Sequence, residues 1–141
     1  MAREATLFFE TGIALPFTAS AAIEKGALCS MGDGMACVTH DGTANVSFAG
    51  VAAKEITTAE ITAGNTQIPL YRQGIFKMTA NAAITAVGAA LAFDAVANTV
   101  KMAVSTDIAS DIIGFSLETC NAQDDTILVE VRPGANNNAY V

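Results

Sequence analysis

The stretch Phe17-Thr-Ala-Ser-Ala-Ala-Ile23 returns later in the chain as Met78-Thr-Ala-Asn-Ala-Ala-Ile84. Each copy leads into an apolar stretch that begins with glycine, Gly26–Met31 in the first case and Gly88–Phe93 in the second. Ordered self-similarity at a long spacing is the signature of a duplicated structural unit. The sequence therefore predicts two copies of one fold.

Two further pairs of blocks keep the same order. Phe48–Ala53 matches Ile112–Leu117, and Thr66–Gly74 matches Thr126–Gly134. The spacing between copies varies by a few residues, so insertions fall between the blocks, where turns are expected. Chance matching in an alanine-rich chain is the alternative, and the shared order of the blocks argues against it.

The periodicity of the chain indicates β-strands. Thr126–Arg132 alternates apolar residues with others, which is the period of a sheet strand. Turn signals separate short apolar stretches at fairly even spacing: Gly32–Gly34, Asp41–Gly42, Gly64–Asn65 and Asp124–Asp125. We therefore expect an all-β domain, a sandwich or barrel built from two pseudo-repeats. Aligned over the last pair of blocks, Pro69 lies opposite Val129, which predicts an edge strand or a bulge there because proline cannot donate to a ladder.

Two segments lie outside the repeats, and together with the repeats they define the expected domain organisation. Residues 17–134 form a single β domain with pseudo-repeats 17–74 and 75–134, residues 1–16 form an extended N-terminal arm, and residues 135–141 form a tail. The arm is apolar, and burying such side chains yields roughly 1.5–3 kcal/mol each. It therefore docks either on its own domain, as a first strand, or on a neighbour.

The composition narrows the classes of partner that the protein is expected to bind. The 141 residues are 52% hydrophobic and 15% charged, with a mean hydropathy of +0.41. We find no run long enough to span a bilayer and no secretory leader, so we expect neither a membrane protein nor a secreted one. Excess apolar surface favours self-association. The net charge of −7 has the wrong sign for nucleic acid or an anionic membrane surface.

The cysteines and the single histidine offer a possible tetrahedral metal site, formed by Cys29, Cys37, His40 and Cys120. Their spacing does not support it, because no Cys-x-x-Cys pair is present. The internal alignment places Cys29 opposite Leu91 and Cys120 opposite Ile56, so both are expected to be core residues. We predict free thiols and no bound metal.

The sequence contains no recognisable catalytic motif. His40 lies in a turn sequence, and we expect it to be solvated and not a general base. Asp124 and Asp125 are expected to accept backbone hydrogen bonds or face water, with weak calcium binding as the alternative. A biotinyl or lipoyl carrier domain, modified at Lys101 on a hairpin tip, is a further alternative with little support. We predict a protein that is not an enzyme and has no cofactor.

Several blocks together resemble the small alanine- and glycine-rich decoration, or cement, proteins of tailed-phage heads: Ala83–Asp94, Asn98–Lys101, Ile113–Glu118 and Asp125–Gly134. The resemblance covers roughly residues 50–134. It implies an all-β domain that attaches to the outside of an assembled capsid, often as a trimer, and bridges neighbouring major capsid subunits. It brings no catalytic residues.

The resulting hypothesis is a structural virion protein, made in the host bacterial cytoplasm and placed on the outer surface of the capsid. Its expected partners are the major capsid protein and further copies of itself, with a trimer favoured. The expected contact residues come from the arm and its junction: Leu7, Phe8, Phe9, Ile13, Leu15 and Pro16. The alternative is another virion component or a carbohydrate-binding module, such as a head fibre base. Sugar binding is the weaker choice, because the chain has no tryptophan and only two tyrosines.

Overall fold

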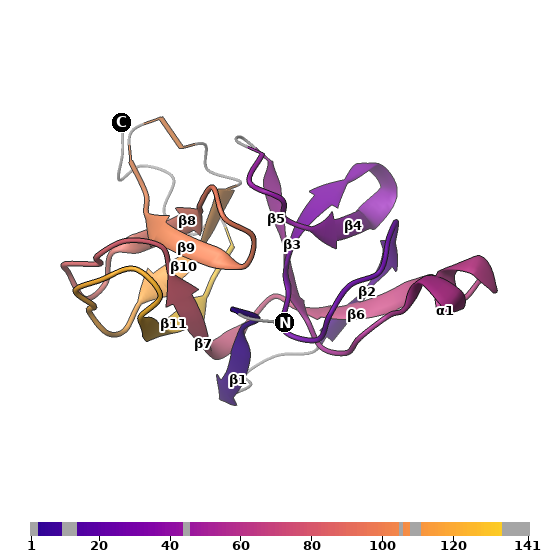
Figure 1. Cartoon of the computed structure of the whole chain (residues 1–141), viewed down its shortest axis with the longest axis horizontal. Coiled ribbons are helices and arrows are strands. Elements are labelled where there is room, and N and C mark those ends of the chain that lie inside the picture. The colour runs from indigo at the N-terminus through magenta and orange to yellow at the C-terminus, as the bar shows by residue number, and fades with distance from the viewer. Residues whose placement is uncertain (1–2, 10–13, 44–45, 105, 108–110, 134–141) are drawn as a thin grey trace.

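The computed structural model describes residues 3–9, 14–43, 46–104, 106–107 and 111–133, and within these ranges the chain is almost entirely β (Figure 1). The strands of the first repeat are β2 (Ala14–Ala19), β3 (Leu28–Gly32), β4 (Ala36–Thr39), β5 (Ser47–Ala52) and β6 (Gln67–Tyr71). Those of the second are β7 (Gly74–Ala80), β8 (Ala90–Phe93), β9 (Thr99–Met102), β10 (Ile112–Ser116) and β11 (Thr126–Val131). Three further elements are β1 (Thr6–Phe9), the 3₁₀ turn η1 (Asp33–Met35) and α1 (Thr58–Thr62).

The two repeats form barrels with the same strand order. The first barrel closes in the order β2-β4-β3-β5-β6, and the second repeats it as β7-β9-β8-β10-β11. Each barrel has one parallel pair of neighbouring strands, β2 with β4 in the first and β7 with β9 in the second. All other neighbouring strands are antiparallel. The predicted all-β fold of two pseudo-repeats is confirmed.

The equivalence extends to a β-bulge. Cys29 pairs with Gly50 in the first barrel, as Leu91 pairs with Gly114 in the second, and in both the register shifts directly after that pair. A Cβ at Gly50 would lie 2.7 Å from the Tyr71 carbonyl oxygen, and one at Gly114 would overlap the carbonyl of a residue on β11. Glycine is therefore required where the bulge brings two backbones together.

The cysteines occupy the predicted core positions. An isolated bridge joins Ile23 to Ile56 in the first repeat, and the equivalent bridge joins Ile84 to Cys120 in the second. Cys120 thus replaces Ile56, as the alignment predicts. Cys29, Cys37 and Cys120 are all buried free thiols.

The expected edge or bulge at Pro69 was wrong. β6 pairs with both β2 and β5, and Pro69 lies opposite Pro16 without a register shift. β5 ends at Ala52, which pairs with Leu70, so the missing N–H of Pro69 falls one residue beyond the β5 ladder. The structure pairs Phe17 with Ile68 as it pairs Met78 with Ile127, so the apolar residues of β6 and β11 correspond after all, one residue out of step with the block alignment.

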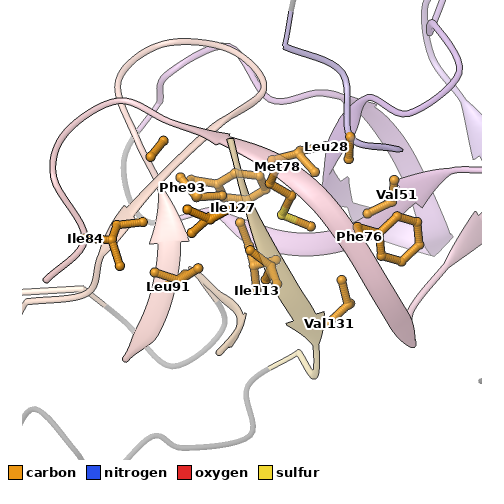
Figure 2. Close-up of a cluster of buried hydrophobic side chains, with 14 of the residues drawn as sticks. Leu28, Val51, Phe76, Met78, Ile84, Leu91, Phe93, Ile113, Ile127 and Val131 are labelled. Atoms are coloured by element: carbon orange, nitrogen blue, oxygen red, sulfur yellow. The ribbon is translucent and has the colours of Figure 1, made fainter. Parts of the chain in front are cut away.

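A shared core joins the two barrels. The largest buried cluster combines Leu28, Phe48 and Val51 of the first repeat with residues of the second such as Phe76 and Phe93 (Figure 2). The rings of Phe48 and Phe93 meet edge to face at a centroid separation of 5.7 Å. The barrels therefore bury apolar surface against each other and not only inside themselves.

Strand β1 belongs to neither barrel ring. It pairs antiparallel with Ile75, Phe76 and Lys77 of β7, while β9 pairs with the other end of β7 at Thr79 and Ala80. On its far side, the Ala5 N–H donates to the Gly26 carbonyl of the first repeat. β1 therefore lies between the barrels and contacts both (Figure 1).

We expect Gly114→Ala to destabilise the fold by about 2–3 kcal/mol, because the added methyl group overlaps backbone that cannot move without opening the β10–β11 ladder. Gly32→Ala is the matched control: its Cβ would meet Ala36 Cβ at an ordinary 3.6 Å, and the change should stay within about 0.5 kcal/mol. Urea unfolding of both variants measures the difference. Equal stabilities would contradict the close approach.

Candidate interaction surface

The N-terminal strand carries two exposed apolar side chains. Leu7 lies opposite Phe76 and is 40% exposed, whereas Phe8 is 60% exposed at the point where the β1–β7 register shifts. A register shift leaves one residue without a partner on the neighbouring strand. The irregularity therefore presents Phe8 to solvent on an otherwise paired strand.

Each side of β1 faces a depression. Beside Leu7, a groove of about 590 Å³ runs between β1 and the first barrel, with Val51, Tyr71 and Phe76 among its apolar walls. Phe8 lines a smaller hollow of about 340 Å³ over the outside of the second barrel, together with Lys77, Glu118 and Leu128 among others. Both hollows combine apolar walls with charged groups, a composition common at protein contacts.

The other predicted contact residues lie on β2, in the first barrel. Leu15 is 42% exposed and Pro16 is exposed as well. By register Leu15 is the equivalent of Phe76, which is only 1% exposed. Phe76 is opposite Leu7 of β1, whereas the described residues place no strand on the corresponding part of β2.

Pro16 accounts for this difference. The Ala19 N–H donates to Thr66 O at 2.8 Å, so by strand alternation the backbone of Pro16 faces the opposite edge of β2. Proline offers no donor there, which disfavours a further strand. Its equivalent in β7 is Lys77, which pairs with Thr6.

Two predicted contact residues are only partly covered by the structure. Phe9 belongs to β1 and pairs with Ile75, but its side chain is outside the described part of the chain. Ile13 lies wholly outside the described residues. The structure thus places Leu7 and Phe8 together on β1, and Leu15 and Pro16 together on the other barrel.

The expected solvated environment of His40 was wrong. The side chain is buried and stacks on Phe93 of the second repeat at a ring centroid distance of 3.8 Å. Its Nε2 lies 3.0 Å from the Thr43 carbonyl oxygen. Burial lowers the pKa of His40, because the imidazolium form loses its hydration. Its turn sequence gave no sign of a partner more than fifty residues away.

Other candidate groups take structural roles. Within the described ranges, no cluster of three or more histidine, cysteine or acidic residues is arranged to hold a metal ion. Hydrogen bonding with Cys37 and burial raise the pKa of the Cys29 thiol well above its ordinary value, so it stays protonated. Asp125 accepts hydrogen bonds from two backbone N–H groups, and Asp124 pairs with Arg3 at 2.9 Å.

Lys101 does not lie on a hairpin tip as a carrier lysine would. It is inside β9, and its Nζ is 3.3 Å from Asp107 Oδ1. This placement removes the carrier alternative. None of the described helices has the length and apolar content of a membrane span.

The fold and surface place the chain among all-β proteins built from a duplicated barrel. A family model described as phage cement protein matches residues 9–131, so the chain belongs to the phage cement proteins, which are structural components of the virion capsid. No curated protein matches the chain. Among solved structures it is similar to the head fiber gp8.5 N base in bacteriophage phi29, with 16% identity, a TM-score of 0.49, and coverage of 84% of this chain and 92% of that one.

The buried His40 makes stability depend on pH. The unfolded chain titrates near the ordinary value of 6.5, whereas the folded chain titrates lower, so the unfolded state binds more protons between the two. The stability that the neutral His40 contributes is therefore fully present above pH 6.5, and the free energy of unfolding falls as the pH drops through that value. In His40→Phe, which keeps a ring on Phe93, this slope should disappear. Urea unfolding between pH 8 and 5.5 tests it, and an equal slope in both proteins would refute the assignment.

Proposed function

We propose that this protein attaches to the outer surface of the assembled phage head and stabilises it by bridging neighbouring major capsid subunits. Membership of the phage cement family supports a structural, non-enzymatic role on the capsid. The observation that carries the contact assignment is the exposure of Phe8 and Leu7 on an ordered strand. The acidic net charge favours the solvent side of the shell over its DNA-filled interior.

The structure supports Phe8 as the centre of a contact. β1 is paired with β7, and Ala5, the residue before β1, donates its N–H to the Gly26 carbonyl, so Phe8 is presented on a backbone that is already ordered. A preorganised contact avoids much of the conformational entropy that binding otherwise costs. Leu117, which is exposed, donates its N–H to Leu128 O beside the Phe8 hollow and extends the apolar surface.

Bridging needs two separate contact regions, and the duplicated fold supplies them. Leu7 and Phe8 lie on β1 against the second barrel, whereas Leu15 and Pro16 lie on the first barrel. When one region is bound, the other meets its subunit at a high effective concentration, which raises the total affinity. A protein that binds the assembled lattice better than free subunits shifts the equilibrium toward assembly. We include Phe9 and Ile13, which connect the two regions along the chain, in this proposed surface.

Phe8→Ser tests the contact directly. Loss of a central apolar anchor costs about 2 kcal/mol or more, so we expect about 30-fold weaker binding to capsids that lack this protein. Val87→Ser is the matched control, because Val87 is also exposed and apolar but lies in the turn before β8. Binding is measured by co-sedimentation with capsids, and folding by thermal unfolding.

The same assay tests stabilisation. Capsids saturated with the native protein should resist heat better than bare capsids, whereas Phe8→Ser should give little protection at the same concentration. If Phe8→Ser remains folded and binds as tightly as Val87→Ser, the proposed surface is wrong. If the native protein binds capsids without raising their thermal stability, the bridging role is wrong.

A further inference from the structure

The joint between the two barrels is asymmetric: one repeat inserts a hairpin and the other receives it. At the tip of the β8–β9 hairpin, Asn98 accepts a hydrogen bond from the Leu28 N–H at 3.0 Å and donates one to Glu4 at 3.0 Å. Beside it, Phe93 stacks on His40 at 3.8 Å. The second repeat thus inserts its β8–β9 hairpin into a receiving face on the first.

The first repeat carries the equivalent hairpin, β3–β4, and its tip is exposed. Met31 pairs with Cys37 as Phe93 pairs with Val100, so Met31 is the counterpart of Phe93. Met35 is the counterpart of Asn98, and the two share a left-handed backbone with φ of 62° and 63°. Asn98 is 8% exposed, whereas Met35 is 45% exposed. Figure 1 shows this hairpin on the side of the first barrel that faces away from the second.

The second repeat carries the equivalent receiving face. Leu28 corresponds to Ala90 and His40 to Ala103, because the His40 N–H donates to Leu28 O as the Ala103 N–H donates to Ala90 O, both at 2.9 Å. Ala90 belongs to a small apolar cluster, separate from the main core, in which Ala103 and Phe115 are only partly buried. Ala90 is 8% exposed and Ala103 is partly buried, and both side chains are smaller than Leu28 and His40, their counterparts in the first repeat.

We propose that the β3–β4 hairpin of one copy docks on the Ala90–Ala103 face of another copy, repeating between chains the contact that joins the two barrels within a chain. Such a contact is heterologous, since it uses two different surfaces. Each copy then offers one hairpin and one receiving face, and a closed ring satisfies all of them. The occupant is a second copy of this chain, because the contact that serves as the template is between two repeats of this chain.

The chemistry of the hairpin suits this role. Met35 is exposed, whereas Met31 is partly buried against the core of its own barrel. Methionine is flexible and polarisable, so its side chain adapts to a receiving surface of small residues. A methionine at positive φ is uncommon and costs energy. A left-handed residue at an exposed tip is consistent with a conformation that is set for a contact. Exposed Val38 on β4 and exposed Val104 beside Ala103 extend the two apolar surfaces.

Sedimentation of the purified chain, without capsids, tests the contact separately from capsid binding. We expect the native chain to associate and Met35→Lys to weaken association at least tenfold, because a lysine would lose its hydration in the joint. Met35→Leu is the matched control, since it places another β-unbranched residue on the same backbone, and it should stay within about twofold. Thermal unfolding of both variants checks that the fold is retained.

A cysteine pair tests the geometry. Met31→Cys with Ala103→Cys should form a disulfide between copies under mild oxidation, because these are the counterparts of the stacked Phe93 and His40. Val87→Cys with Ala103→Cys is the control pair and should not cross-link efficiently. The native thiols are buried and should not contribute.

Three results would overturn the proposal: a native chain that is monomeric at all concentrations, association that Met35→Lys leaves unchanged, or cross-linking no stronger in the Met31 pair than in the Val87 pair. Capsid binding could persist in each case. Failure here is therefore distinguishable from failure of the proposed Phe8 contact.

Discussion

Each barrel closes through a short parallel pairing that covers only part of its first strand, β2 or β7. The arrangement of the molecule depends on the part of each first strand that this pairing leaves open. β4 covers only Thr18 and Ala19 of β2, and β9 covers only Thr79 and Ala80 of β7. The other half of each first strand keeps an open edge. In the second barrel β1 pairs with that edge, and in the first Pro16 removes the donor that a further strand would need. The position of β1 between the barrels, and the exposure of Phe8 and Leu15, follow from this difference.

The sequence was sufficient to predict the duplication, the all-β class and the core role of the cysteines, because these depend on patterns that both copies share. The alignment of the repeated blocks, however, misplaced β6 by one residue. Aligning the last blocks by their shared Arg-x-Gly ends put Pro69 opposite Val129, whereas strand pairing aligns inward-facing residues, Ile68 with Ile127. A one-residue shift exchanges the two faces of a strand. Matching inward-facing positions therefore aligns the two repeats more reliably than matching identical residues.

The exposure of the candidate contact residues was predictable in part, for a similar reason. Apolar residues without a counterpart in the repeat stood out, and Leu7, Phe8, Leu15 and Pro16 are exposed in the structure. The division of these residues between a strand of the second barrel and a strand of the first depends on long-range pairing, which local patterns do not contain. His40 shows the same limit: a turn sequence describes its backbone, but its burial comes from Phe93 in the other repeat. The joint between repeats therefore had to be read from the structure.

The pairing of β1 with β7 also sets an order of events during synthesis. Residues 14–71 contain every strand of the first barrel, so that barrel can close while the second is still inside the ribosome. β1 leaves the ribosome before the first barrel but has no partner strand until β7 emerges, about seventy residues later. The strand that presents Phe8 is thus made before the first barrel but is fixed only after it. A chain truncated before β7 would lack the ordered strand, so the surface that carries Phe8 forms only after translation has passed the first barrel.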